Sequence, residues 1–278
     1  MAAQLQDKTA IVTGASSGIG RAIARHMGAE GATVYLVGRD AGRLDAVAAD
    51  IAADGGKGIA FPADVRDIST LKAVVDKAVG ETGKLNVMVN GAGLERGFGQ
   101  AFADSDPEGW REMLEVNVLA LLAGSQAAIR AMRATGSEGH IVNIGSVAGR
   151  REASGVYGAT KAAVNAIGTT LRQELEGDPI RVVQILPGAV LTNFGRNMPP
   201  QIVNGLLGAM GVEMEFTPGA ILPDDLIDRV QAAAAQAFAS ADDIARAVIY
   251  AVTQPITLNI YEIEVRPQMG LRIGNTEG

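Results

Sequence analysis

Short apolar runs alternate with helical patterns along most of this chain, and this alternation constrains the fold more than any other feature. Seven runs rich in Val and Ile predict strands over Thr9–Thr13, Thr33–Val37, Ile59–Ala63, Leu85–Asn90, His140–Ile144, Arg181–Leu186 and Ile260–Val265. Six patterns of helical period lie between them, over Gly18–Ala29, Ala41–Ala53, Ile68–Thr82, Glu108–Ala134, Gly155–Leu175 and Ala241–Val252. Apolar strands joined through helices predict one α/β domain over residues 1–278, with a doubly wound parallel sheet of seven strands.

One stretch, residues 194–240, breaks this rhythm because it contains no convincing strand and carries Pro199, Pro200 and Pro218. A long segment of this kind inside an α/β domain is typical of a binding loop or lid made of short helices. A helical pair at a subunit interface fits the same residues, and the two readings are compatible. We predict a substrate-binding lid over 194–240 and a polar tail over 268–278.

Composition excludes several classes of protein. The net charge of −7 disfavours nucleic acid and anionic membranes as partners, and the absence of Cys excludes thiolate metal sites. Because the N-terminus is polar and no run of about 18 apolar residues occurs, a cytoplasmic protein is expected. The two histidines, His26 and His140, lie in a helical and a strand pattern, so we expect structural roles for both and no metal site.

A glycine-rich turn follows the first predicted strand and opens the first predicted helix. It runs Gly14-Ala15-Ser16-Ser17-Gly18-Ile19-Gly20. Glycines let a backbone approach a pyrophosphate closely, and a helix N-terminus presents free N–H groups and a positive dipole end to it. A glycine turn alone could merely join strand to helix, but in this position it predicts a dinucleotide site in a Rossmann-type fold.

The second strand ends in Gly38-Arg39-Asp40, which bears on cofactor choice. An acid near this point usually binds the ribose 2′-OH, whereas an Arg accommodates a 2′-phosphate. Gly38 leaves the acid position empty, so we expect NADP(H) in preference to NAD(H), which stays the second option. The alternative is a solvated turn in which Arg39 pairs with Asp40. The Asn90-Gly91-Ala92-Gly93 turn after the fourth strand suits a ribose and a nicotinamide, although an ordinary turn would look the same.

Tyr157 and Lys161 stand four apart in a helical pattern and therefore share a face, eleven and fifteen residues after the strand-end Ser146. A phenol has a pKa of about 10, and a nearby ammonium is expected to lower it. Tyr157 can then act as general acid in reduction and general base in oxidation, with Ser146 bonded to the substrate oxygen. A solitary pair at this spacing is more often a surface pair, but the strand-end Ser and the glycine turn argue against that reading.

With these motifs in order, the sequence resembles the short-chain dehydrogenase/reductase family from about Leu5 to Leu191 and again over Ala241–Pro267. The resemblance implies a catalytic tetrad of Asn117, Ser146, Tyr157 and Lys161, with a water held by Asn117. It also implies an adenine contact at Asp64 and a nicotinamide-side loop at Pro187, Gly188 and Thr192. Together, the expected cofactor contacts are Gly14, Ser16, Ser17, Gly18, Ile19, Gly20, Arg39, Asp64, Val65, Asn90, Ala92, Gly93, Tyr157, Lys161, Pro187, Gly188, Val190 and Thr192.

Some details refine or qualify this resemblance. The final strand resembles the corresponding strand of a subgroup of NADP-dependent reductases, which includes 3-hydroxy acid dehydrogenases and clavulaldehyde-type reductases. Gly91 replaces the second of the family's paired Asn residues, and the Ser-to-Tyr spacing is short, so the connecting loop must be tight. Two charged groups, Glu95 with Arg96 and Arg150–Glu152, stand near the expected substrate entrance, where solvated loop charges are the more common reading.

The sequence therefore predicts an oxidoreductase that moves a hydride between NADP(H) and a small-molecule alcohol or carbonyl substrate. Two alternatives stay open: a nucleotide-binding regulatory protein that has lost catalysis, and a lyase or epimerase on the same scaffold. The family resemblance implies a homotetramer, with a dimer as second choice. Apolar residues on the two long central helices would supply the contact: Leu114, Leu121, Leu122, Ala162, Ala163 and Ile167.

Overall fold

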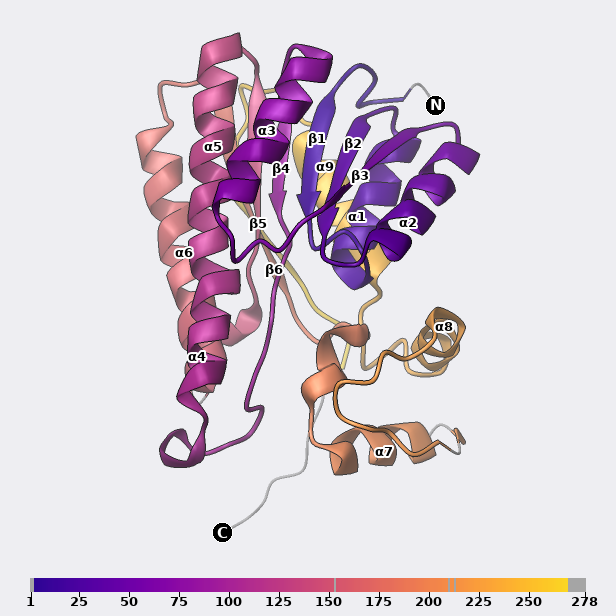
Figure 1. Ribbon diagram of the computed structural model, residues 1–278. Helices are drawn as coiled ribbons and strands as arrows, with labels where there is room; N and C mark the ends of the chain where they lie inside the picture. Colours follow the sequence, from indigo (N-terminus) through magenta and orange to yellow (C-terminus); the bar gives the residue numbers. More distant parts are fainter. Residues whose placement is uncertain (1–2, 153, 210, 213, 270–278) are drawn as a thin grey trace.

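The fold is built on one sheet of seven parallel strands (Figure 1), seen in a computed structural model that describes residues 3–152, 154–209, 211–212 and 214–269. The strand order is β3-β2-β1-β4-β5-β6-β7. The strands are β1 (Thr9–Thr13), β2 (Thr33–Gly38), β3 (Lys57–Pro62), β4 (Val87–Asn90), β5 (Gly139–Ile144), β6 (Ile180–Pro187) and β7 (Glu262–Val265). The order reverses between β1 and β4, as in a doubly wound fold, and this confirms the predicted architecture.

Helices cover both faces of this sheet, which is why the central strands are apolar throughout (Figure 1). One face carries α1 (Gly18–Ala29), α2 (Ala41–Ala53) and α9 (Ala241–Val252). The other carries α3 (Ser69–Thr82), α5 (Ala120–Thr135) and α6 (Gly155–Glu174), while α4 (Pro107–Leu114) precedes α5 and contacts α6. Buried side chains at helical spacing, such as Ile23 and Met27 on α1, pack directly on the strands.

The predicted long helix over Glu108–Ala134 is interrupted, and this is a correction. A π-helical turn, η2 (Glu115–Leu119), separates α4 from α5. Hydrophobic period cannot reveal such a turn, because π-turns are rare and insert only one residue into an otherwise regular pattern. Asn117 lies in its middle and is 2% exposed, so the turn places a polar amide in the interior.

Within 194–240, the described residues (194–209, 211–212 and 214–240) form short helices and no strand of the sheet. They include most of the 3₁₀ turn η4 (Asn193–Asn197), α7 (Pro200–Ala209) and α8 (Asp224–Ala233), which lie beyond the carboxyl edge of the sheet (Figure 1). Asn193 closes the base of this segment, because its side chain donates to the Leu222 carbonyl and accepts from the Leu222 N–H. A separate small core fills its interior, built from Leu207, Phe216, Leu226 and Val230. The expected tail over 268–278 falls, except for its first two residues, outside the described residues.

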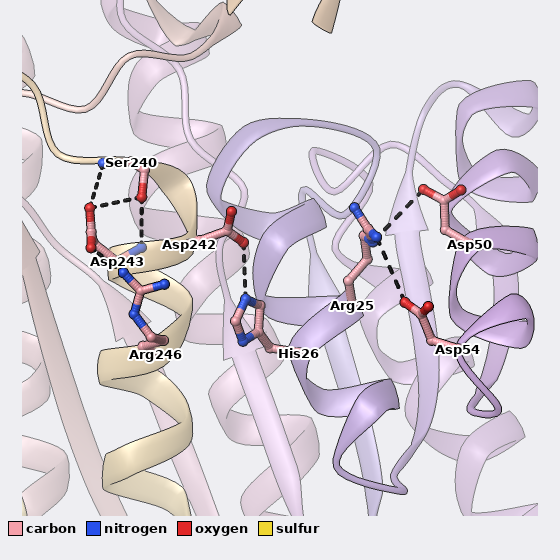
Figure 2. Close-up of polar contacts among 8 residues, drawn as sticks. All are labelled: Arg25, His26, Asp50, Asp54, Ser240, Asp242, Asp243 and Arg246. Atoms are coloured by element: carbon pink, nitrogen blue, oxygen red, sulfur yellow. Dashed lines mark hydrogen bonds and ion pairs between the residues drawn. The ribbon is translucent and has the colours of Figure 1, made fainter. Parts of the chain in front are cut away.

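Polar contacts on the outer face join α9, α1 and α2 (Figure 2). Ser240 and Asp243 cap each other reciprocally at the start of α9. Asp242 lies 2.9 Å from His26 Nε2, and Arg25 lies within 4 Å of Asp50 and Asp54. These pairs are half-exposed and contribute little individually, but they give His26 the structural setting expected for it.

Of the described helical stretches, Pro107–Thr135 is long and apolar enough to cross a membrane by length and composition alone. In this fold 44% of its most apolar window is buried against the protein, as in the core helix of a globular domain.

The described residues also form two short 3₁₀ helices, η1 (Phe102–Asp104) before α4 and η3 (Val147–Arg150) after β5. An isolated parallel bridge joins Val190 and Ala239.

Candidate active site

The carboxyl ends of the central strands open into a cavity of about 780 Å³ at the point where the strand order reverses. Ligands of doubly wound sheets bind at this position, because loops from neighbouring strands diverge there. Most of the expected site residues line this cavity: Gly14, Ser16, Ser17, Gly18, Ile19, Gly20, Arg39, Asp64, Val65, Ala92, Gly93, Ser146, Tyr157, Lys161, Pro187, Gly188, Val190 and Thr192.

The glycine turn forms a backbone cradle that leaves no room for side chains. A Cβ on Gly20 would lie 2.3 Å from the Gly14 carbonyl oxygen, and one on Gly14 would lie 2.9 Å from that of Gly91. Gly14 and Gly18 also have positive φ angles, of 73° and 54°. At the start of α1, Ser17 provides no side-chain cap, so the first N–H groups stay available to a ligand. This donor set fits the pyrophosphate of a dinucleotide.

Thr13 locks this cradle to the neighbouring loop, a role that the sequence analysis missed. Its Oγ1 accepts from the N–H groups of Gly91 and Ala92, at 3.0 and 3.1 Å, and donates to the Val89 carbonyl. The β1 and β4 loops are therefore held as one unit beneath the cavity.

At the adenine end, Arg39 follows β2 and lines the cavity. Asp40 caps α2 and pairs with Arg43, so the alternative pairing of Arg39 with Asp40 does not occur. Asp64 is held by Arg66, which donates to both carboxylate oxygens and keeps the pKa of Asp64 below its ordinary value. Arg66 was not among the expected residues, since nothing in the sequence marks it.

At the opposite end, Ser146, Tyr157 and Lys161 come together from η3 and α6. The Ser146 hydroxyl accepts from the Ala148 N–H at 3.1 Å, and Ser146 lies near enough to the Tyr157 phenol to lower its pKa. Lys161 Nζ lies 5.8 Å from the centre of the Tyr157 ring and donates to the Ile144 carbonyl at 2.9 Å. The short loop between Ser146 and Tyr157 is accommodated by Gly149, where a Cβ would lie 2.7 Å from the Lys161 backbone.

The expected lowering of the Tyr157 pKa by Lys161 is not found in this structure, and this is a correction. Burial raises the pKa of Tyr157 to about 12, and the charge of Glu95 raises it further, against the lowering effect of Ser146. Burial also lowers the pKa of Lys161 to about 8, because a buried ammonium loses its proton more easily than a solvated one. The phenol is therefore protonated near neutral pH.

Two expected residues do not line the cavity. The Asn90 side chain turns into the interior, where it donates to Ser125 and to Asn143, so a cofactor contact at Asn90 stays a prediction for its backbone. Asn117 accepts from the Leu94 N–H and donates to the Leu94 carbonyl and to Thr160. Because its amide is fully engaged, Asn117 fixes the loop after Gly93 against α6.

The charged residues of the two loops near the expected substrate entrance, Glu95 with Arg96 and Arg150 with Arg151, lie in different environments. Arg96 lines the cavity and pairs with Glu112 at 2.8 Å, whereas Glu95 is 6% exposed, and burial raises its pKa to about 7. Arg151 lines the cavity, while Arg150 pairs with Glu262 on β7. Sequence reasoning could not separate these neighbours, because the direction of a loop side chain is decided by packing.

Apolar side chains from distant segments close the substrate end. Phe194 lies with its ring centre 5.7 Å from that of Tyr157, and Phe98, Val116 and Met198 line the same cavity. The predicted lid over 194–240 pointed only in general terms to Phe194 and Met198, and no motif marks Phe98 or Val116.

This combination of a glycine cradle with a Ser–Tyr–Lys group in one cavity defines a nicotinamide-dependent oxidoreductase. A family model described as short chain dehydrogenase matches residues 8–202. An uncharacterised oxidoreductase of Staphylococcus saprophyticus is 34% identical over 269 residues, covering 95% of this chain and 99% of that protein. The chain belongs to the short-chain dehydrogenase family.

Solved structures of similar proteins share the fold. A metagenomic short-chain oxidoreductase in complex with NADP is 30% identical, with a TM-score of 0.73, and the match covers 96% of this chain and 99% of that one. An alcohol dehydrogenase from the archaeon Thermococcus sibiricus, complexed with 5-hydroxy-NADP, is 27% identical with a TM-score of 0.73. That match covers 93% of this chain and 95% of the archaeal one.

Proposed function

We propose that this protein is an NADP(H)-dependent carbonyl reductase or alcohol dehydrogenase, with Tyr157 as its general acid and base. One observation carries the proposal: Ser146, Tyr157 and Lys161 meet at one end of the cavity whose other end is formed by the glycine cradle and Arg39. A cavity with a phosphate-binding end and a proton-donating end can hold a dinucleotide and a small substrate at the same time.

The bound cofactor supplies the hydride, and the residues of this chain control the proton and the position of the substrate. In reduction, the Tyr157 phenol donates its proton to the substrate oxygen as negative charge develops there. The Ser146 hydroxyl donates a hydrogen bond to the same oxygen. Lys161 holds the nicotinamide ribose. The raised pKa of Tyr157 keeps its proton in place at neutral pH, which suits it to act as the acid.

The residues after β2 support NADP(H) over NAD(H). Gly38 provides no carboxylate to repel a 2′-phosphate, and Arg39 provides a cation beside it. Both solved relatives described above carry NADP or a derivative of it, which supports the same choice.

Residues 194–240 act, in this proposal, as a substrate lid. Phe194 and Met198 approach the Ser146–Tyr157 end from this segment, and with Phe98 and Val116 they favour a substrate with an apolar body. The proposal also includes a cytoplasmic location and assembly into a homotetramer through the helices around Asn117 and Tyr157.

A direct test follows NADPH consumption by the purified protein with matched aldehydes, ketones and keto acids of increasing apolar size. We expect turnover with at least one class, and loss of that turnover in Tyr157→Phe. If the protein binds NADPH but turns over no carbonyl in the panel, and no alcohol with NADP⁺, a non-catalytic nucleotide-binding role is favoured instead.

A further inference from the structure

Five arginines lie near the adenine end of the cavity, and their carboxylate partners divide them into two groups. Arg66 is paired with Asp64, as described above. Arg43 lies 3.4 Å from the Asp40 carboxylate, and Arg96 lies 2.8 Å from that of Glu112. Across the described ranges, neither Arg39 nor Arg196 forms an ion pair with a carboxylate. Both of these line the cavity, Arg39 from the end of β2 and Arg196 from η4.

Arg196 is held in place although it has no anionic partner among those residues. One of its terminal nitrogens donates to the Asn193 carbonyl at 3.0 Å, which leaves the rest of the guanidinium fork free. Its side chain is half-buried, and burial together with the charges of Arg39, Arg96 and Arg43 lowers its pKa. A cation kept among like charges indicates a site for an anion, which would remove the repulsion.

One carboxylate close to Arg39 is already engaged. The charge of Arg39 helps to lower the pKa of Asp64, but both oxygens of Asp64 accept from Arg66. The pyrophosphate has a different site, because the glycine cradle and the start of α1 offer it backbone N–H groups.

We propose that Arg196 and Arg39 together bind the 2′-phosphate of NADP(H), so that the segment bearing substrate contacts also recognises the cofactor. This inference rests on the NADP preference proposed above. Two planar guanidinium forks match the oxygens of a dianionic phosphate. Because Asn193 ties η4 to Leu222, the bound phosphate also fixes the base of residues 194–240.

The test measures equilibrium binding of adenosine 2′,5′-bisphosphate and adenosine 5′-monophosphate, by calorimetry, together with NADPH and NADH. For Arg196→Ala we expect about a tenfold weaker affinity for the bisphosphate and for NADPH, with the monophosphate and NADH changed less than about twofold. Arg196→Lys keeps the charge and should retain part of the discrimination. Arg229→Ala, an exposed arginine on α8, is the matched control and should change none of the four affinities.

The outcomes separate this inference from the proposed function. If the wild type binds NADH as tightly as NADPH and the two adenosine phosphates equally, both the NADP preference and the role of Arg196 are wrong. If the wild type prefers the 2′-phosphate and Arg196→Ala keeps that preference, Arg39 suffices and only this inference is overturned. An equal loss for NADPH and NADH would place Arg196 on a part common to both and would also overturn it.

Discussion

Tyr157 and Glu95 lie close enough to influence each other's protonation, although only Tyr157 lines the cavity. Burial raises the pKa of both groups, and the carboxylate of Glu95 raises that of Tyr157 further. Sequence reasoning found Tyr157 because its spacing to Lys161 is a motif. It could not find the direction of the pKa shift, which depends on how deeply the fold buries the phenol.

Replacing Tyr157 with Phe removes the proton donor and keeps the ring. Turnover should fall by about a hundredfold or more, because general acid catalysis is lost, while cofactor affinity stays nearly unchanged. Steady-state kinetics combined with cofactor titration measure both quantities. Retention of a tenth of the wild-type turnover would show that Tyr157 is not the general acid.

Lys161→Ala, by contrast, should reduce both turnover and cofactor binding.

Replacing Glu95 with Gln tests the buried carboxyl through stability. Its folded pKa of about 7 lies above the ordinary value of 4.5, so the folded state binds more protons between these pH values and stability falls as pH rises through them. Glu95→Gln should raise the free energy of unfolding by about 3 kcal/mol at pH 8 and by less at pH 5. Denaturant titrations at both pH values measure this, with exposed Glu138→Gln as control; an equal gain at the two pH values contradicts the assignment.

The same substitution should also change the pH profile of alcohol oxidation. Oxidation needs the ionised phenol, and the Glu95 charge raises the pKa of Tyr157. Its removal should therefore move the rise of kcat/KM to lower pH. An unshifted profile would mean that Glu95 does not act on Tyr157.

Cofactor choice is tested at Gly38 and Arg39. A Cβ at Gly38 would lie 3.2 Å from Ser16 Oγ, so a side chain fits after a small movement of the serine. Gly38→Asp should reverse the preference toward NADH, because the carboxylate accepts from the ribose and repels a phosphate. Arg39→Ala should raise KM for NADPH several-fold and leave KM for NADH nearly unchanged. Kinetics with both cofactors decide, and a wild type that uses NADH more efficiently would refute the reading of both positions.

Among the secondary-structure elements, most helices and strands could be predicted to within two residues. Period and capping residues determine them locally, as Ser240 does for α9. The π-turn at Glu115–Leu119 and the inward turn of Asn90 could not be predicted, because both depend on tertiary contacts. Most site residues could also be predicted, because they belong to local sequence motifs in a recognisable order. Phe194, Arg196 and Arg66 could not, because tertiary packing brings them to the cavity.

Residues 194–240 should respond to ligands as one unit. Their small core of Leu207, Phe216, Leu226 and Val230 is separate from the main cores, and Asn193 closes their base. We expect fast amide hydrogen exchange there in the free protein and slower exchange with NADPH and substrate bound. Strand β5 provides the internal control. Exchange that is equally slow in both states would show a rigid structural element.

At the scale of the whole molecule, the proposed assembly would use the outer side of α4 and α5. Leu114 and Leu122 are 47% and 42% exposed, as an interface requires, but Leu121 is buried and cannot contribute directly, which corrects the expectation for that residue. We expect light scattering to give a tetramer mass, and Leu122→Glu to reduce it. Ile221→Glu, at a similarly exposed position in residues 194–240, should leave it unchanged. A concentration-independent monomer in the wild type would reject the assembly.

The π-turn has a second effect, on the outside of the molecule. In a regular α-helix, residues five apart point in different directions, whereas in a π-turn residue i+5 follows residue i along the axis. Leu119 should therefore lie closer to the direction of Leu114 than it would in a regular α-helix, and Leu114, Leu119 and Leu122 are all among the exposed large apolar residues. The turn that holds the buried Asn117 is thus also expected to bring these exposed leucines nearer to one another. Deleting one residue of this turn would alter an internal amide and an external contact surface at once, so the two features are expected to be gained or lost together.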